Sequence, residues 1–170
     1  LDGVRVPPSA RLERVNGWRD VARILRAMRS DVAWIAAGLQ AGSLDATVAY
    51  ARERHQFDRP IGGFQLVQDL IADISLDADA ARLLAWRCAD LIDRGEPFGT
   101  AASKAKLFAS EAAVRAANNA IQVHGGAGYV DDFPVAKYLR DARVMTLYEG
   151  TSQIQKLLIG RAETGVSAFT

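Results

Sequence analysis

The sequence has one cysteine, two histidines and almost no net charge. Cys88 has no partner for an intramolecular disulfide. His55 and His124 lack a companion cysteine or carboxylate at metal-ligand spacing, so no metal centre is expected. The 21 Lys and Arg residues against 20 Asp and Glu residues leave a formal charge of +1, and no basic cluster is dense enough to follow a phosphate backbone. Nucleic acid is therefore not an expected partner.

Long apolar runs are also missing. No apolar stretch reaches the roughly 18 to 20 residues that a membrane-spanning helix needs, and no segment resembles a signal peptide. We therefore expect a protein of the cytoplasm or of another reduced intracellular compartment, which folds without disulfides or metals. The chain begins with Leu1 and not with Met, which indicates the C-terminal piece of a longer protein.

Apolar residues recur with the helical period over most of the 170 residues. The pattern predicts helices over about 18–54, 64–91, 100–123 and 134–143, and a last helix from about residue 152. Short turns join them, so we predict an all-α fold, an up-down four-helix bundle with additional short helices. Alanine is frequent in the third helix, which would let its neighbours approach closely. Cys88 and the three tryptophans (Trp18, Trp34 and Trp86) are interpreted as packing groups.

Residues 1–15 depart from the helical pattern. Val4 and Val6 alternate with Gly3 and Arg5 ahead of Pro7, which predicts a short strand that leads into a connector. The partners of this strand would lie upstream. We therefore divide the chain into residues 1–15, the end of an upstream β-domain with its connector, and residues 16–170, a helical bundle domain.

The best candidate for chemistry is a carboxylate in a break between two helical patterns. Gly150 interrupts the apolar period directly after Glu149, and Ser152 with Gln155 has the spacing of a capping box, so a helix should begin at Ser152. A loop in this position could aim Glu149 into a pocket. The alternative is that Glu149 only stabilises the positive end of the helix dipole, a surface effect of about 0.3 to 1 kcal/mol.

The glycine-rich run from Gly125 to Gly128 follows a helix and not a strand, so it does not match the fingerprint of a dinucleotide-binding fold. We interpret it as a helix C-cap in which glycine supplies a positive φ.

Several short motifs follow one another over about 100 residues. They are Arg54-His55-Gln56-Phe57, Pro60-Ile61, Phe64-Gln65, Gln122-Val123-His124-Gly125-Gly126-Ala127-Gly128-Tyr129, Tyr138-Leu139-Arg140-Asp141-Ala142 and Tyr148-Glu149-Gly150-Thr151-Ser152-Gln153-Ile154-Gln155. Each motif is weak alone, but in this order and spacing they resemble the C-terminal half of the acyl-CoA dehydrogenase family. The opening Asp2-Gly3-Val4-Arg5-Val6-Pro7 also resembles the last strand of that family's middle β-domain.

The resemblance implies an FAD enzyme that removes a proton from the α carbon of an acyl thioester and a hydride from the β carbon. Glu149 matches the family's catalytic base, and apolar surroundings would make its carboxylate a better proton acceptor. Some relatives carry the base at the position of Met28, which cannot act as one. Arg29, Tyr148 and Gly150 match substrate-binding positions, although Arg29 could equally be a solvated helix residue and Tyr148 a core residue.

The resemblance also implies one group of flavin contacts after the first helix. Arg54, Phe57 and Gln65 match groups of one subunit that hold the pyrophosphate and adenine side of FAD bound mainly to its neighbour. Asp58 stands where relatives usually have glycine. Its carboxylate could pair with Arg54 and weaken the phosphate contact.

A second group of matching flavin contacts lies further along the chain. Gln122 and Gly126 match contacts to the adenine end of FAD. Thr151 and Gln153 match residues at a helix start that approach FAD within the same subunit. Taken singly, each of these residues would more often be a surface group or a helix cap.

The resemblance further implies substrates and partners. The substrates would be thioesters of coenzyme A or of an acyl carrier protein, and electron-transfer flavoprotein would accept the electrons. The protein would assemble as a homodimer or homotetramer and act in fatty acid metabolism. Two alternatives remain: a catalytically silent helical assembly subunit, and a flavin oxidase or monooxygenase on the same fold. The joint presence of Glu149, Arg54, Gln65 and Gln122 favours the dehydrogenase.

Overall fold

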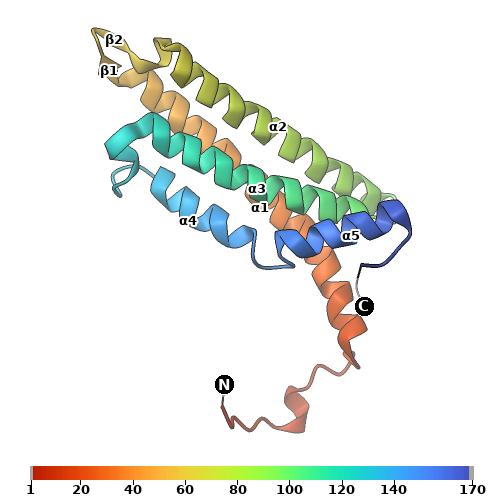
Figure 1. Ribbon diagram of the computed structural model, residues 1–170. Helices are drawn as coiled ribbons and strands as arrows, with labels where there is room; N and C mark the ends of the chain where they lie inside the picture. The colour runs from red at the N-terminus through yellow and green to blue at the C-terminus, as the bar shows by residue number, and fades with distance from the viewer. Residues whose placement is uncertain (1, 169–170) are drawn as a thin grey trace.

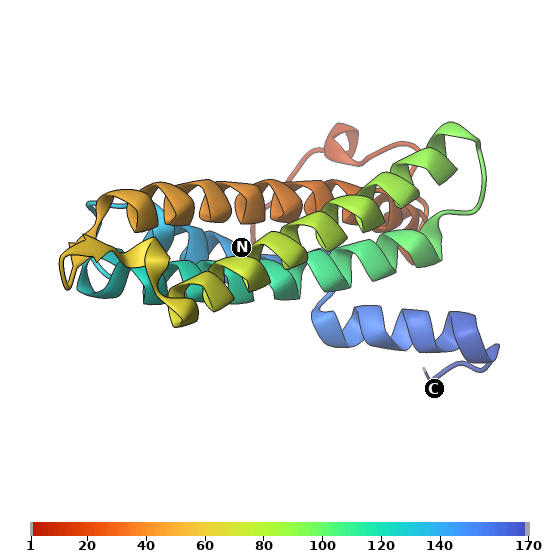
Figure 2. The same cartoon turned by 90° about the horizontal axis from the view of Figure 1, so that it is seen from above.

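The computed structural model describes residues 2–168. Three long helices alternate in direction: α1 (Trp18–Glu53), α2 (Gln65–Asp93) and α3 (Gly99–His124), with α2 antiparallel to the other two (Figure 1). Two shorter helices, α4 (Val135–Met145) and α5 (Ser152–Thr164), then run back along α3 in the opposite direction to it (Figures 1 and 2). The predicted up-down bundle with short helices is confirmed. Its fourth helix position is shared by α4 and α5, with a loop between them.

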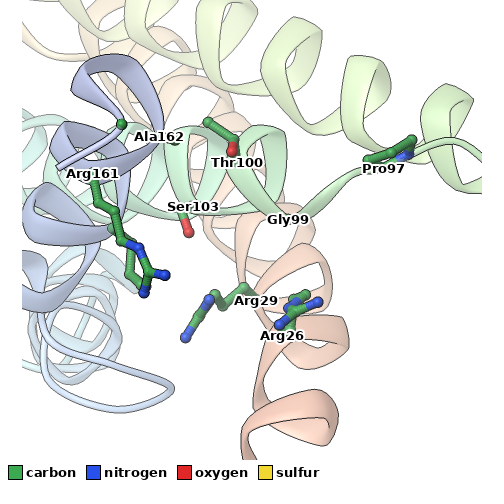
Figure 3. Close-up of a pocket in the computed structure, with 10 residues that line it drawn as sticks. Arg26, Arg29, Pro97, Gly99, Thr100, Ser103, Arg161 and Ala162 are labelled. Carbon is green, nitrogen blue, oxygen red and sulfur yellow. The ribbon is translucent and has the colours of Figure 1, made fainter. Parts of the chain in front are cut away.

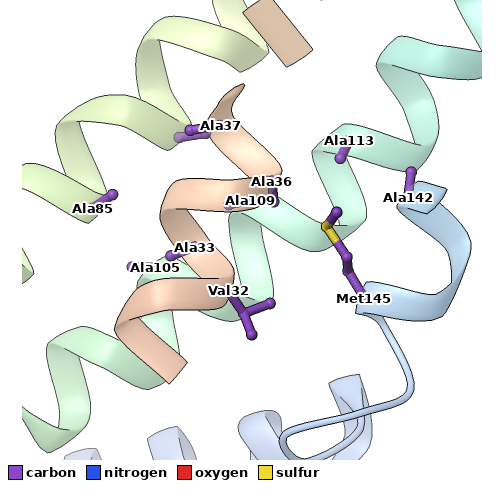
Figure 4. Close-up of a cluster of buried hydrophobic side chains, with 11 residues drawn as sticks. Val32, Ala33, Ala36, Ala37, Ala85, Ala105, Ala109, Ala113, Ala142 and Met145 are labelled. Carbon is purple, nitrogen blue, oxygen red and sulfur yellow. The ribbon is translucent and has the colours of Figure 1, made fainter. Parts of the chain in front are cut away.

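Helix α3 is the centre of the fold, because it contacts each of the other four helices. The central core is lined mainly by alanine, which allows helix axes to lie near the short end of the usual 8 to 10 Å separation, by the general rule for helix packing. Cys88 on α2 is fully buried, in agreement with its interpretation as a small core residue. The side chains of the central core, most of them labelled in Figure 4, are Val32, Ala33, Ala36, Ala37, Ala81, Ala85, Ala105, Ala109, Ala113, Ala142 and Met145.

The connection from α1 to α2 contains a small hairpin that the sequence pattern did not predict. Strands β1 (His55–Gln56) and β2 (Arg59–Pro60) pair antiparallel, and the 3-10 turn η2 (Ile61–Gly63) follows. Phe57 and Asp58, at the tip, have φ angles of 52° and 61°. A two-residue turn with two positive φ angles fits the twist of a hairpin. Aspartate tolerates this region better than most residues, which explains how Asp58 can replace glycine there.

The N-terminal segment of the chain differs from its prediction. The strand expected at Val4 and Val6 is not formed; both residues are exposed, and a short 3-10 turn, η1 (Pro8–Ala10), leads on towards α1. A strand requires ladder hydrogen bonds to a partner, and nothing in residues 2–168 pairs with this segment. Leu1, where the predicted β-domain segment starts, lies outside the described residues.

The tryptophans are not the packing groups that the sequence suggested. Trp18, Trp34 and Trp86 are exposed to 73%, 41% and 63%. The reason is that alanines fill the space between the helices, so the indole rings lie on the outside of the bundle. None of the helices described here has the length and apolar character that crossing a membrane would require.

Candidate active site

The break between α4 and α5 is a tight loop that carries Glu149. Glu149 and Gly150 have positive φ angles of 54° and 90°. The loop is closed by the backbone N–H of Ser152, which donates to the carbonyl of Thr146 at 3.0 Å. A left-handed glutamate is conformationally unfavourable by roughly 1 to 2 kcal/mol, so surrounding contacts have to hold it there.

Two fully buried side chains supply those contacts. Gln155 of α5 donates from Nε2 to the carbonyl oxygens of Glu149 at 3.1 Å and of Gly150 at 3.0 Å. Lys106 of α3 donates from Nζ to the same Gly150 oxygen at 2.9 Å. A Cβ atom at position 150 would lie 2.5 Å from Gln155 Nε2, so this close approach and the positive φ both require glycine.

Helix α5 begins at Ser152, as predicted, but the predicted capping box is wrong. The N-cap residue is Thr151, whose Oγ1 accepts from the N–H of Ile154 at 3.3 Å. Ser152 instead donates its hydroxyl hydrogen to Glu111 of α3, and Gln155 turns inward to the loop. Both Thr151 and Ser152 are good N-cap types, so packing against α3 decided between them.

The Glu149 carboxylate is partly buried and is not a cap of the helix that follows. Its Oε2 atom is buried and has no hydrogen-bond partner among the described residues. Arg29 of α1 is also partly buried, and its Nε likewise has no partner there. Burial and the charge of Arg26 lower the pKa of Arg29, while the charge of Glu149 raises it. Arg29 is therefore electrostatically coupled to Glu149 and is not a freely solvated residue.

Tyr148, which precedes Glu149, and Met28 on α1 differ in burial. Tyr148 is partly buried and packs against the central core. Burial raises the pKa of its phenol, and the nearby charge of Glu149 raises it further. Met28, where some relatives carry the base, is 42% exposed. Glu149 thus remains the candidate base of this region.

A pocket of about 540 Å³ opens beside Arg29. Arg26 and Arg29 of α1 and Arg161 of α5 line it, together with the first turns of α3 (Figure 3). No carboxylate is among its lining residues, so the pocket has a positive potential that suits an anionic group.

The predicted cofactor residues fall into two regions. Thr151 and Gln153 lie next to Glu149. The other group lies at the end of the bundle that carries the hairpin (Figure 1), and its members are all exposed: Arg54, Phe57, Gln65, Gln122 and Gly126. About 25 residues of helix separate Arg29 from Arg54 along α1, or about 37 Å at 1.5 Å per residue.

At the end of the bundle that carries the hairpin, stacked rings join α1 to α3. The ring of Tyr50 on α1 stacks on that of His124 on α3, with ring centroids 4.2 Å apart. Gly125 then ends α3 with a φ of 60°, as predicted for a glycine C-cap, and the 3-10 turn η3 (Gly125–Gly128) follows. Asp58 forms no ion pair with Arg54 in the described chain, so the suspected weakening of Arg54 is not seen.

The sequence did not predict the roles of Lys106 and Glu111. Both lie on α3 behind the loop, where Lys106 donates to the Gly150 carbonyl and Glu111 accepts from the Ser152 hydroxyl. A signal for Lys106 was present: it lies one turn from Ala102 and Ala109, on the buried stripe of an alanine-rich helix. A charged residue on such a stripe is rarely fully buried without a specific partner. No group of three or more His, Cys, Asp or Glu residues that could hold a metal ion was found within residues 2–168.

Comparisons with known proteins identify the family of the chain. The family model described as acyl-CoA dehydrogenase, C-terminal domain, matches residues 15–164. A probable acyl-CoA dehydrogenase, YngJ, from Bacillus subtilis (strain 168) is 44% identical over 162 residues, which are 95% of this chain and 43% of the relative. The CarC subunit of the caffeyl-CoA reductase-Etf complex from Acetobacterium woodii is 39% identical over 160 residues, or 94% of this chain and 42% of the relative.

Solved structures show the same relationship. Glutaryl-CoA dehydrogenase from Mycobacterium smegmatis matches with a TM-score of 0.93 and 39% identity, over 100% of this chain and 44% of that one. A glutaryl-CoA dehydrogenase from the same organism in complex with FADH2 matches with a TM-score of 0.93 and 30% identity, over the same shares.

The chain belongs to the acyl-CoA dehydrogenase family and is its C-terminal domain. Proteins of this family are flavin-containing oxidoreductases. The chain spans less than half the length of the curated relatives that it matches, 43% in the case of YngJ.

Proposed function

We propose that the complete protein is an FAD-dependent acyl-CoA dehydrogenase and that Glu149 removes the α proton of the acyl thioester. The observation that supports this proposal is the buried Oε2 atom of Glu149, which has no hydrogen-bond partner in the described chain. A carboxylate oxygen held without a donor is available to accept a proton, and general base catalysis is typically worth about 10² to 10⁴-fold in rate.

The backbone around Glu149 supports the same reaction. Its N–H forms no hydrogen bond within residues 2–168, whereas the carbonyl oxygens of Glu149 and Gly150 are both satisfied. A free, rigidly held N–H can donate to the thioester oxygen as negative charge develops on it. Tyr148, Arg29 and Gly150 would then shape the substrate side of the site.

The donor set also fits FAD. Arg54 is exposed, forms no ion pair in the described residues and has the planar fork that binds phosphate oxygens, while Gln65 and Gln122 lie at the same end of the bundle. When bound, FAD accepts the hydride from the β carbon. Phe57 and Gly126 would complete this hairpin-end group, while Thr151 and Gln153 would approach a flavin near Glu149.

Because Arg54 lies about 37 Å along α1 from Arg29, the arginine that is coupled to Glu149, we propose that each FAD is held between two subunits of a homodimer, or of a homotetramer built from dimers. Electron-transfer flavoprotein is the proposed electron acceptor; one relative is itself a subunit of a reductase-Etf complex. The thioester carrier would be coenzyme A or an acyl carrier protein, and the three arginines of the pocket favour an anionic carrier.

Replacement of Glu149 by glutamine in the complete flavoprotein tests this function. The amide keeps the shape of the side chain but cannot accept the proton, so flavin bleaching by acyl thioester under anaerobic conditions should slow by about 10² to 10⁴-fold. Flavin content should not change. Glu163→Gln is the matched control, because Glu163 is an exposed residue of α5 paired with Lys104.

Bleaching of the Glu149→Gln variant at a rate close to that of the parent would show that Glu149 is a structural residue. Oxygen consumption distinguishes the remaining alternatives. A dehydrogenase should pass electrons to electron-transfer flavoprotein faster than to oxygen, whereas an oxidase or monooxygenase should show the reverse, and a silent assembly subunit should show neither.

A further inference from the structure

Lys106 is a completely buried lysine behind the candidate active site. It lies on the alanine-lined face of α3 and has no exposed surface. Its Nζ donates one hydrogen bond, to the carbonyl of Gly150, and no carboxylate lies within ion-pair distance of it in residues 2–168. Removing an ammonium group from water is costly unless it is well paired, so stability of the bundle alone does not account for a lysine here.

The hydrogen bond of Lys106 ends on the loop that directs Glu149. The Gly150 carbonyl accepts from Lys106 of α3 at 2.9 Å and from Gln155 of α5 at 3.0 Å, so two helices hold one peptide group. That peptide joins two residues with positive φ angles, Glu149 and Gly150, to the start of α5. Release of the carbonyl would let both the carboxylate and the N–H of Glu149 change direction.

The charge of Lys106 also acts on this site. Burial lowers the pKa of Lys106, as does the charge of Arg29 on α1, while Glu111 on α3 and Glu149 in the loop raise it; the result is a pKa of about 8. Helix α5 contributes the uncharged Gln155 to these surroundings. Lys106 is therefore positively charged at neutral pH and loses its charge as the pH rises through about 8. A nearby cation favours the ionised form of a carboxylate.

We propose that Lys106 is a positioning residue for the dehydrogenation: it holds the Gly150 carbonyl, and through it Glu149, in the reactive orientation, and its charge sets the pH range in which Glu149 accepts the α proton. This inference rests on the proposed role of Glu149. It assigns a part in the site to a fully buried residue of α3, behind the loop that carries Glu149.

Three variants of the complete flavoprotein separate the hydrogen bond from the charge. Lys106→Met removes both, Lys106→Gln keeps a hydrogen-bond donor without the charge, and Lys106→Arg keeps the charge. Lys104→Met is the matched control on the same helix, since Lys104 lies at the surface and pairs with Glu163. The measurement is the rate of anaerobic flavin bleaching by butyryl-CoA, octanoyl-CoA and glutaryl-CoA across the pH range.

Lys106→Met should lower the limiting bleaching rate about 10- to 100-fold, with flavin content unchanged, because small misplacements of reacting groups have effects of that size. In a plot of bleaching rate against pH, the acid limb of this variant should lie at higher pH than that of the parent. The inflection that the parent shows near pH 8 should be absent. Lys106→Gln should recover part of the limiting rate and keep the shifted profile. Lys106→Arg should restore the acid limb, and Lys104→Met should match the parent.

The inference is overturned if Lys106→Met bleaches within twofold of the parent with an unshifted profile while Glu149→Gln is inactive. If Lys106→Met does not yield folded flavoprotein, Lys106→Gln and Lys106→Arg are compared with each other. Identical pH profiles of the bleaching rate in these two variants also overturn the inference. A parental rate in Glu149→Gln, or no bleaching of the parent by any of the three thioesters, contradicts the proposed function itself and removes the basis of this inference.

Discussion

Replacing Gly150 by alanine should disrupt the loop that carries Glu149. The new Cβ would lie 2.5 Å from Nε2 of Gln155, and the backbone φ of 90° is one that alanine strongly disfavours. Gln155 is fully buried between the loop and the bundle. It could relieve the clash only by moving away from the two carbonyl oxygens that it now binds.

The cost of Gly150→Ala can be worked out from these contacts. The unfavourable φ contributes about 1 to 2 kcal/mol by analogy with other left-handed residues. A buried amide and its carbonyl partners that lose their hydrogen bonds add about 1 to 3 kcal/mol. We therefore expect the free energy of unfolding of the domain to fall by about 2 to 5 kcal/mol, a large part of the 5 to 15 kcal/mol that is typical of a domain.

Urea unfolding of the 170-residue domain, followed by far-ultraviolet circular dichroism, measures this loss. Gly160→Ala is the matched control, because Gly160 lies within α5 and a Cβ there would meet no atom within 4 Å. Alanine is the better helix former by up to about 1 kcal/mol, so this variant should be as stable as the parent or more stable. Equal unfolding midpoints for Gly150→Ala and the parent would refute the idea that Gln155 requires a glycine at this place.

The isolated domain should give a far-ultraviolet circular dichroism spectrum dominated by helix that a chelator leaves unchanged; a spectrum dominated by β structure would contradict the bundle. The isolated domain should bind FAD weakly or not at all, because its contacts serve mainly one end of the cofactor, and copurification of stoichiometric flavin would show otherwise. Light scattering should find the complete, active flavoprotein as a dimer or a dimer of dimers, and a fully active monomer loaded with flavin would exclude shared binding. Burial lowers the pKa of His124 below its ordinary value of 6.5, so below that pH the unfolded chain binds a proton that the folded one resists. Stability should be fully present above pH 6.5 and decline as the pH falls towards the folded pKa; His124→Gln should abolish this part of the pH dependence of the urea midpoint, and an unchanged dependence would count against it.

Several elements were predictable because their causes are local. Apolar periodicity placed the three long helices to within about two residues, and Gly125 ended α3 with the positive φ that such a cap needs. The start of α5 at Ser152 was predictable for the same reason, since a break, a polar cap and an apolar period follow one another there. The motifs around Glu149 and Arg54 were sufficient to recognise the family.

Other features depended on neighbours that no local pattern specifies. The cap of α5 is Thr151 because Ser152 bonds to Glu111 on α3, and the tryptophans are exposed because alanines already fill the core. The hairpin tip at Phe57 and Asp58 lacks the usual asparagine or glycine, so its turn was not recognisable from residue types.

By itself the sequence determined where helices begin and end, which faces are apolar, and which carboxylate stands in a break between helices. Only the tertiary structure decided what surrounds that carboxylate. Lys106 is 43 residues before Glu149 in the chain, and the antiparallel packing of α3 against α5 brings its ammonium group to the Gly150 carbonyl. Hydrogen bonds and charges act over a few ångströms in space, whatever the separation along the chain, so the environment of Glu149 could be known only once the helices were packed.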